Sequence, residues 1–458
     1  MLGLALVALT LLAPLPFGSN HPLLWLLGTV LLASGLAVYA LWLLSKGRNW
    51  PATMDGATGA ILAGGLYLAW VSLQGLPLGW IGLAPFETLL PTDGVILSHD
   101  TLSLTPGASR IAALRVAGYG TLFFLTLQAA SDRGRARGMA RALAFGTTLW
   151  AIYGAVAINA FGDTILIFEK WAYEGVATGP FINRNAFATF LAFGLCAASG
   201  LAAGRLMSRR TKSGAPQRTR HLIRLMERRR MEGLIMLLAA LIIFAVLLRT
   251  GSRMGALSGL TGATLTLGLV VGRRSGLGWG ALVRLGIAGI LLGTLALTLF
   301  GHILFERLGS LERDADIRIA LYTQIGQMIA LKPWTGWGLD GFETSFRAIR
   351  SLPVSADLSW DRAHSTYLAL WSEAGLLAGS IPPLLMLAAF VACLRAALSR
   401  DNDIVLPAIA AGALLAGGMH ATVDFGLEML ANVWLLLMLV AIALARPARR
   451  SRSSGASS

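Results

Sequence analysis

The sequence predicts an all-α polytopic membrane protein with about twelve transmembrane helices and a large outer loop that contains an amphipathic helix. The 458 residues are 55% hydrophobic and only 13% charged, with a mean hydropathy of +0.67, whereas soluble domains carry about 25% charged residues. Apolar runs of about 20 residues, long enough to cross ~30 Å of hydrocarbon, recur along the chain. These observations exclude a soluble globular enzyme, a coiled coil and a disordered protein.

The apolar runs give twelve candidate membrane helices. The first run has no basic segment before it and no cleavage site after it, so we expect a retained helix instead of a signal peptide. The runs are 2–17, 23–45, 56–76, 111–130, 141–161, 185–207, 234–248, 254–272, 281–303, 375–394, 404–421 and 427–445.

The basic residues predict how these helices are oriented. Twelve crossings place both termini on one side, and the segments on that side hold most of the 38 Lys and Arg residues but few of the 23 acidic residues. By the positive-inside rule this side is the cytoplasm. We interpret the basic run 205–230 as an orientation anchor against anionic lipid.

The net charge of +15 does not indicate a nucleic-acid partner, because the basic residues lie between apolar spans and not on one face of a soluble fold. Cys196 and Cys393 fall inside predicted spans, so we expect no disulfide framework.

Two outer segments are long enough to hold a functional site. Segment 77–110 contains turn signals and short strand-like runs and is expected to form a lid or a packing element. Segment 302–372 shows helical periodicity over 317–331 and then breaks at the Pro- and Gly-rich run 332–338. This pattern predicts an amphipathic helix lying on the outer leaflet, followed by a loop folded over the bundle.

Four arginines on the outer side are candidate ligand-binding residues. Arg184 begins the sixth span, Arg249 and Arg253 flank the turn between the seventh and eighth, and Arg318 lies on the amphipathic helix. An arginine at the centre of a membrane helix costs about 2.5 to 3.5 kcal/mol, and its guanidinium matches phosphate oxygens bidentately. The alternative is that these side chains reach lipid head groups or pair with nearby carboxylates.

His364 is the candidate general base, because it lies in a polar run that enters a helix from the outer loop. An imidazole with a pKa near neutral can take a proton from a sugar hydroxyl. Asp361 or Glu373 is a candidate to orient it, and Arg362 lies beside it. A purely structural histidine is the alternative.

Two further acidic patterns have weaker interpretations. His420 and Asp424, at i and i+4, are expected to share a helix face as a hydrogen-bonded pair that stabilises the helix end. Asp314-Ala315-Asp316 is similar to the Asp-x-Asp that binds a metal-nucleotide in other glycosyltransferases. Since an outer compartment lacks sugar nucleotides, we expect no metal, and the role of Asp314 and Asp316 stays open.

Four successive segments resemble motifs of the O-antigen ligase and O-antigen polymerase superfamily, and the resemblance runs from about residue 179 to the end of the last span. The motifs are GPFINRNAFA at 179–188, TGSR at 250–253, PWTGWGLDGF at 333–342 after Arg318, and AHSTYL at 363–368 followed by EAGL at 373–376.

The resemblance implies a metal-independent, inverting glycosyltransferase without a cofactor, at the periplasmic face of the bacterial inner membrane. Its donor would be an undecaprenyl diphosphate-linked glycan. Its acceptor would be lipid A core for a ligase, or a second lipid-linked glycan for an O-antigen or exopolysaccharide polymerase.

The resemblance also assigns roles to residues. Arg253 and Arg318 match the diphosphate-binding arginines and His364 matches the proposed base, followed by Ser365 where asparagine is common. We place eight other residues as possible substrate-binding or supporting groups. They are Arg184, Asn185, Arg249, Asp361, Arg362, Glu373, His420 and Asp424.

The expected organisation is an N-terminal membrane region (1–178), a ligase-like catalytic region (179–445) with the outer loop 302–372, and a cytoplasmic Arg/Ser tail (446–458). Three other functions remain as alternatives. A secondary transporter is suggested by SDRGR at 131–135, although few carboxylates lie in the spans to couple ions. The others are a non-catalytic assembly scaffold and a protein oligosaccharyltransferase, which usually carries a further soluble outer domain.

Overall fold

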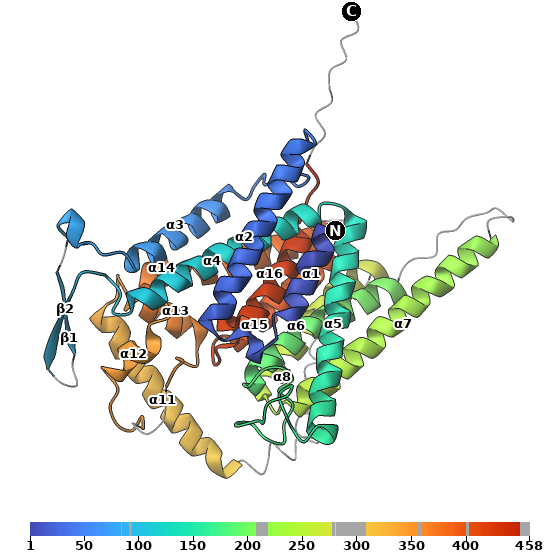
Figure 1. The fold of residues 1–458 in the computed structure, drawn as a ribbon. Helices are drawn as coiled ribbons and strands as arrows, with labels where there is room; N and C mark the ends of the chain where they lie inside the picture. Colours follow the sequence, from blue (N-terminus) through green and yellow to red (C-terminus); the bar gives the residue numbers. More distant parts are fainter. Residues whose placement is uncertain are drawn as a thin grey trace, which may run out of the picture.

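The computed structural model describes residues 1–83, 85–90, 94–207, 219–276, 280, 308–355, 360–399 and 403–448. In this part of the chain, seven helices are long and apolar enough to cross a membrane and four shorter ones are apolar (Figure 1). The long ones are α2 (Pro22–Ser45), α4 (Pro106–Ala129), α5 (Arg133–Ala160), α6 (Arg184–Leu206), α7 (Thr219–Arg249), α8 (Arg253–Ser275) and α14 (Leu376–Ser399). The short ones are α1 (Leu2–Leu12), α3 (Thr58–Gln74), α15 (Val405–His420) and α16 (Leu430–Leu444).

These helices correspond to all the predicted spans except 281–303, which lies outside the described residues. The all-α polytopic architecture is therefore confirmed. Two helices begin well before their predicted apolar runs. Asp132 caps α5, with its carboxylate accepting a hydrogen bond from the Arg135 N–H at 2.9 Å, and α7 already begins at Thr219, inside the basic run 205–230. Hydropathy locates only the part of a helix that suits lipid, and not its polar extension.

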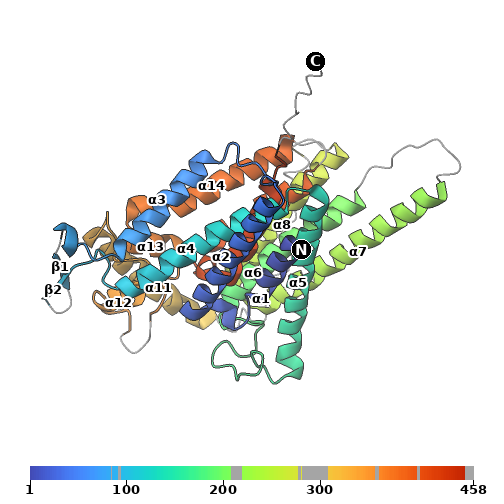
Figure 2. The same ribbon diagram turned by 45° about the horizontal axis from the view of Figure 1, so that its top comes forward.

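Helix α6 forms the centre of the bundle. Its most apolar stretch is entirely buried, and it packs against α5, α7, α8 and α15 (Figures 1 and 2). Small residues allow these close approaches, as is typical of membrane helices. For example, α8 and α15 approach so closely at Gly262 that a side chain there would overlap the carbonyl of Gly412.

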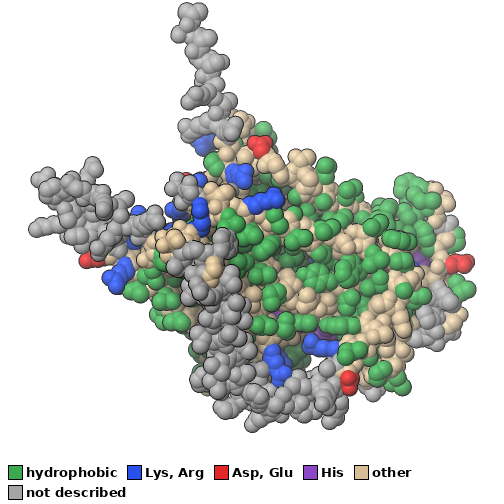
Figure 3. Space-filling model, turned by 180° about the vertical axis from the view of Figure 1, so that it is seen from behind, with side chains coloured by type: hydrophobic (Ala, Val, Ile, Leu, Met, Phe, Trp, Pro, Cys, Tyr) green, Lys and Arg blue, Asp and Glu red, His purple; other side chains and the backbone are tan. Residues whose placement is uncertain are grey.

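The two ends of the bundle differ in character. At one end, which we call the arginine-rich end, Glu232 forms ion pairs with Arg205 at 2.9 Å and Arg141 at 3.4 Å, and Asp403 pairs with Arg137 at 3.5 Å. The long described connections that follow α3, α5 and α11 lie at the opposite end, which we call the loop end. Hydrophobic side chains cover the broad middle of the face seen in Figure 3, and Lys and Arg side chains gather toward its margins.

A β-hairpin projects from the loop end (Figure 1). Strands β1 (Phe86–Leu90) and β2 (Val95–His99) pair antiparallel, with Phe86 opposite His99. A short helix, η2 (Gly79–Ile81), precedes them. The expectation of short strands in segment 77–110 is thus confirmed.

The helix predicted at 317–331 is α11 (Leu308–Leu331), which is followed by α12 (Phe342–Arg347) and α13 (Thr366–Ala374). The expectation that its apolar face lies on the outer leaflet is wrong. Leu321, Ile325 and Met328 are fully buried in a separate core that the same loop builds around Trp337 and Phe346. The indole N–H of Trp337 donates to the Met328 carbonyl at 2.8 Å. An apolar helical stripe needs an apolar partner, and here the partner is its own loop.

The Pro- and Gly-rich run 332–338 holds this loop onto the end of α13. The N–H groups of Trp337 and Gly338 donate to the carbonyls of Ser372 and Glu373, each at 2.9 Å. Gly336 and Gly375 both have positive φ, +66° and +81°, and a side chain at either would overlap the backbone of the other segment. Only glycine fits such a crossing.

Candidate active site

His364 lies in the loop immediately before α13, at the loop end of the bundle. The start of α13 is docked on the segment that follows α15: the Thr366 N–H donates to the Ala421 carbonyl at 3.0 Å, and its hydroxyl donates to the Asp424 carbonyl at 3.2 Å. The Tyr322 hydroxyl of α11 donates to the His364 carbonyl at 2.9 Å. These contacts hold His364 at a positive φ of 51°, a conformation uncommon outside glycine and often found at functional sites.

The imidazole of His364 is held between aromatic rings. Its ring centroid lies 5.3 Å from that of Phe425 and 6.2 Å from that of Trp360. Its Nδ1 is buried and has no hydrogen-bond partner among the described residues. Burial, aided by the Arg318 cation and opposed by Asp361, lowers the pKa of His364 to about 4. The near-neutral pKa expected from the sequence is therefore too high, because desolvation disfavours the imidazolium.

Arg318 lies on α11 beside His364. Its guanidinium donates to the Val423 carbonyl at 3.4 Å and is otherwise exposed. Val423 belongs to the same segment after α15 on which α13 is docked. Arg318 and His364, which are predicted to act together, are therefore both supported by the segment that follows α15.

Asn185 and Asp424 meet in this region, although the sequence does not pair them. The Asn185 amide donates to the Asp424 carboxylate at 2.8 Å, and His420 Nδ1 lies 2.8 Å from the Thr189 hydroxyl. Helix α15 ends at His420, so the expectation that His420 and Asp424 share a helix face is wrong. The chain turns after His420, and both side chains instead bond to successive turns of α6. Burial raises the pKa of Asp424 to about 7, against the hydrogen bond from Asn185.

Arg184 lies against the turn between α7 and α8. A β-carbon added at Gly251 would lie 3.3 Å from the Arg184 guanidinium, so the two residues are in close contact. The Arg249 carbonyl accepts a hydrogen bond from the Ala177 N–H at 2.9 Å. Arg253, half-buried, begins α8 directly after the Ser252 N-cap. The turn that separates Arg249 from Arg253 is therefore brought to the start of α6, which carries Arg184.

Tyr173 is a site residue that the sequence does not reveal. Its ring lies under the Arg184 guanidinium, 5.5 Å from it, and its hydroxyl accepts a hydrogen bond from the Asn183 amide at 3.3 Å. The charges of Arg318, Asp361 and Asp424 also act on its phenol. Tyr173 thus contacts Arg184 and also lies within range of the charges near His364. No motif surrounds it, and only the folding of the loop after α5 brings it there.

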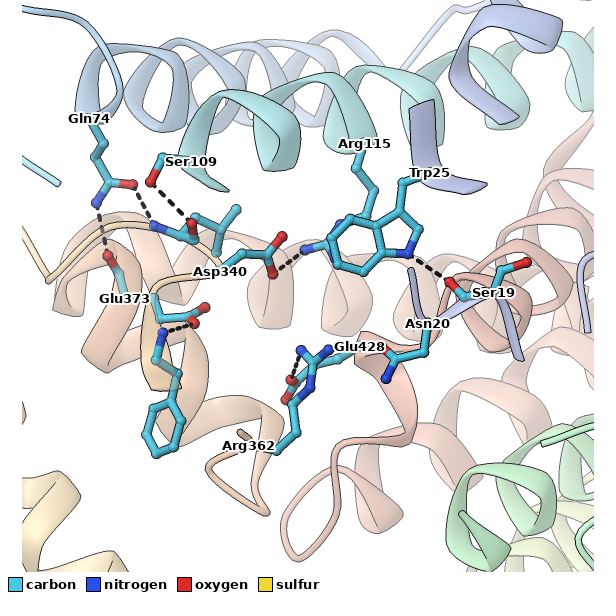
Figure 4. A network of polar contacts seen from close by, with 12 residues as sticks. Ser19, Asn20, Trp25, Gln74, Ser109, Arg115, Asp340, Arg362, Glu373 and Glu428 are labelled. Carbon is cyan, nitrogen blue, oxygen red and sulfur yellow. Dashed lines mark hydrogen bonds and ion pairs between the residues drawn. The ribbon is translucent and has the colours of Figure 1, made fainter. Parts of the chain in front are cut away.

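Arg362 and Glu373, expected near His364, belong to a different cluster (Figure 4). Arg362 donates to Glu428 at 3.0 Å and to the side-chain oxygen of Asn20 at 2.8 Å. The carboxylate of Glu373 accepts a hydrogen bond from the Phe342 N–H at 3.0 Å. Asp361 is exposed and acts on His364 through its charge.

The same cluster includes an ion pair between Arg115 of α4 and Asp340, at 2.8 Å, with the guanidinium 4.2 Å from the Trp25 ring centroid. We call Arg115, Asp340, Arg362, Glu373 and Glu428 the polar network. It contains two arginines and three carboxyl groups. Burial, with Asp340 and Glu428 nearby, raises the pKa of Glu373 to about 8, so the neutral form of this carboxyl group is favoured at pH 7.

The described residues contain no group of three or more His, Cys, Asp or Glu side chains placed to hold a metal ion. Asp314 and Asp316 both lie on α11, and the Asp316 side chain is exposed. What the site does offer is a neutral imidazole, guanidinium groups suited to phosphate oxygens, and a tyrosine ring against one of these guanidinium groups.

Comparison with known proteins identifies the family of this region. None of the curated proteins matches the chain. The model of the O-antigen ligase family matches residues 238–382, a range that contains Arg253, Arg318 and His364 but neither Arg184 nor Asp424. The chain is therefore a multi-pass membrane protein with an O-antigen ligase domain, and that family consists of glycan-transferring enzymes of lipopolysaccharide and polysaccharide biosynthesis.

Proposed function

We propose that this protein is an inverting, metal-independent glycosyltransferase of the bacterial inner membrane. It moves a glycan from undecaprenyl diphosphate to a sugar hydroxyl at the periplasmic face, with both of its termini in the cytoplasm. The observation that carries this proposal is the placement of His364 beside Arg318, on a loop held by the segment that follows α15. The O-antigen ligase match covers both residues.

In this proposal, His364 accepts the proton of the acceptor hydroxyl as that oxygen attacks the anomeric carbon. The bond from that carbon to the diphosphate breaks, and the leaving group departs already charged. It therefore needs cationic stabilisation more than protonation, which Arg253 and Arg318 supply. The low pKa of His364 keeps the imidazole neutral and ready to accept a proton.

Arg184, Arg249 and Asn185 are proposed to support this site. Arg184 adds a third cation beside the turn that ends at Arg253, and Asn185 holds Asp424 in place under the loop that bonds to Arg318. Membrane lipids would surround the spans, so that the polyprenyl tail stays in the bilayer while its diphosphate reaches the arginines.

The acceptor distinguishes two versions of the proposal. We favour a ligase with lipid A core as acceptor, and a polymerase that joins lipid-linked repeat units is the alternative. Deleting the gene in its native host and sizing the lipid-linked and surface glycans separates them. Long polymer trapped on undecaprenyl diphosphate, with bare acceptor at the surface, indicates a ligase, whereas single repeat units without long polymer indicate a polymerase.

Complementation completes this experiment. The wild-type gene should restore the glycan, and Arg253→Lys should not, because a lysine is a point charge without the guanidinium fork. Transfer by the purified protein should also persist in EDTA. Unchanged glycans in the deletion strain would overturn the proposal.

A further inference from the structure

The segment between α5 and α6, residues 161–183, has a rigid inner framework. The ammonium group of Lys170 donates to the Asp163 carboxylate and to the Val176 carbonyl, each at 2.7 Å. The other Asp163 oxygen accepts a hydrogen bond from the Gly175 N–H at 2.6 Å. The Lys170 side chain is only 2% exposed. A buried charge pair with these backbone contacts holds the segment in one shape, which is what a preorganised binding surface requires.

Outside this framework the segment displays an aromatic face, which we define as Phe17, Phe168 and Trp171. Phe17 belongs to η1 (Phe17–Ser19), and its ring centroid lies 5.3 Å from those of Phe168 and Trp171. Phe168 is 46% exposed and Trp171 is 60% exposed. Clustered aromatic rings that remain exposed offer an apolar surface to a ligand.

The aromatic face adjoins the candidate active site through Tyr173. Only Ala172 separates Trp171 from Tyr173, whose ring lies 5.5 Å from the Arg184 guanidinium. On its other side, the face adjoins the polar network, because Asn20 directly follows η1 and accepts a hydrogen bond from Arg362. A ligand bound at Arg184 therefore lies close to the segment that carries this face.

The surroundings of the aromatic face favour a neutral, hydroxylated ligand over lipid. Glu169 and Glu174 flank the exposed rings and are themselves exposed. Carboxylates are costly in hydrocarbon and are repelled by anionic head groups. A sugar suits both the exposed rings and the flanking carboxylates. A pyranose ring packs its C–H face on an aromatic ring, while its hydroxyl groups remain hydrogen-bonded to water and polar neighbours.

We propose that the aromatic face is a sugar-binding subsite for the glycan of the lipid-linked donor, and that it takes the rings beyond the sugar attached to the diphosphate. This inference rests on the proposed function and extends it by naming where the rest of the glycan lies. Tyr173 marks the junction between the subsite and the diphosphate site. Trp171, the most exposed ring of the face, is expected to make the main contact.

The test measures kcat/KM for transfer from donors that carry one sugar or several, using the full-length protein in lipid nanodiscs. With Trp171→Ala, we expect little change for the single-sugar donor and about a tenfold loss for the longer donors. Trp171→Phe keeps an aromatic ring and should recover most of that loss. Phe168→Ala should show the same dependence on donor length and serves as a second variant.

Trp80→Ala is the matched control, because Trp80 is 78% exposed on η2, in the segment that leads to the β-hairpin. The Trp80→Ala variant should transfer glycan from every donor at the wild-type rate. An equal loss for all donors with Trp171→Ala, or the same length dependence with Trp80→Ala, would overturn the sugar-binding assignment. If the wild-type protein transferred none of the donors, the proposed function itself would fall, and the inference with it.

Discussion

The polar network and the candidate active site both contain arginines and carboxyl groups, but they use them differently. In the polar network, Arg115 pairs with Asp340 and Arg362 pairs with Glu428, all of them well inside the protein. At the candidate site, the guanidinium of Arg318 is exposed and bonds to a backbone carbonyl, and Nδ1 of His364 has no partner among the described residues.

This difference shows that neighbouring positions in a motif can have unrelated roles. Only Ala363 separates Arg362 from His364, yet their side chains enter different clusters. Buried ion pairs are costly to break, whereas an exposed guanidinium such as that of Arg318 is available to a ligand. Four experiments test this distinction.

The largest expected effect is on catalysis and comes from His364→Asn. Asparagine tolerates the positive φ at this position, so the backbone is preserved while the base is lost. We expect kcat to fall about 10² to 10⁴-fold with an unchanged unfolding temperature. Near wild-type turnover would show that His364 is not the base.

The next effect is on stability and comes from Arg362→Ala. It leaves Glu428 buried without its guanidinium partner, and breaking such a pair costs about 3 to 5 kcal/mol. We expect less folded protein and a lower unfolding temperature in detergent. The double variant Arg362→Ala/Glu428→Gln should recover part of the loss, since no unpaired charge remains. A fully stable Arg362→Ala protein without transfer activity would instead place Arg362 in the site.

A smaller effect concerns the pH profile. Because burial and Arg318 lower the pKa of His364 to about 4, kcat/KM should fall only below about pH 5. Arg318→Gln removes the cation that disfavours the imidazolium, so the acidic limb should move to higher pH. Asp361→Asn removes the opposing carboxylate, so the limb should move to lower pH. If the pH profiles of the wild type and of the two variants coincide, His364 is not the titrating group.

The smallest expected effect is that of Glu373→Gln. Because burial and the nearby carboxylates raise the pKa of Glu373 to about 8, the side chain is neutral at pH 7, and glutamine keeps the oxygen that accepts from the Phe342 N–H. Stability and transfer should stay close to wild type. Glu373→Ala removes that acceptor and should cost about 1 to 3 kcal/mol, as thermal unfolding would measure. If Glu373→Gln were as damaging as Glu373→Ala, the neutral state assigned to Glu373 would be wrong.

The candidate site was only partly predictable from the sequence. The motifs singled out His364, Arg318 and Arg253, and the structure brings the first two together. The partner of Asp424 was not predictable, because α15 ends at His420 and the turn redirects the carboxylate to Asn185. Tyr173 gave no signal, since its position depends on how the Lys170 framework folds the segment after α5.

The apolar helices and their order could be predicted from the sequence, because the length and composition of apolar runs follow directly from the thickness of a bilayer. The sequence also predicted that α11 is amphipathic. Two features became evident only from the folded chain: the apolar face of α11 is buried against its own loop, and Arg362 and His364 belong to separate clusters. Such choices depend on contacts between residues far apart in the chain, which a local pattern of hydropathy or charge does not record.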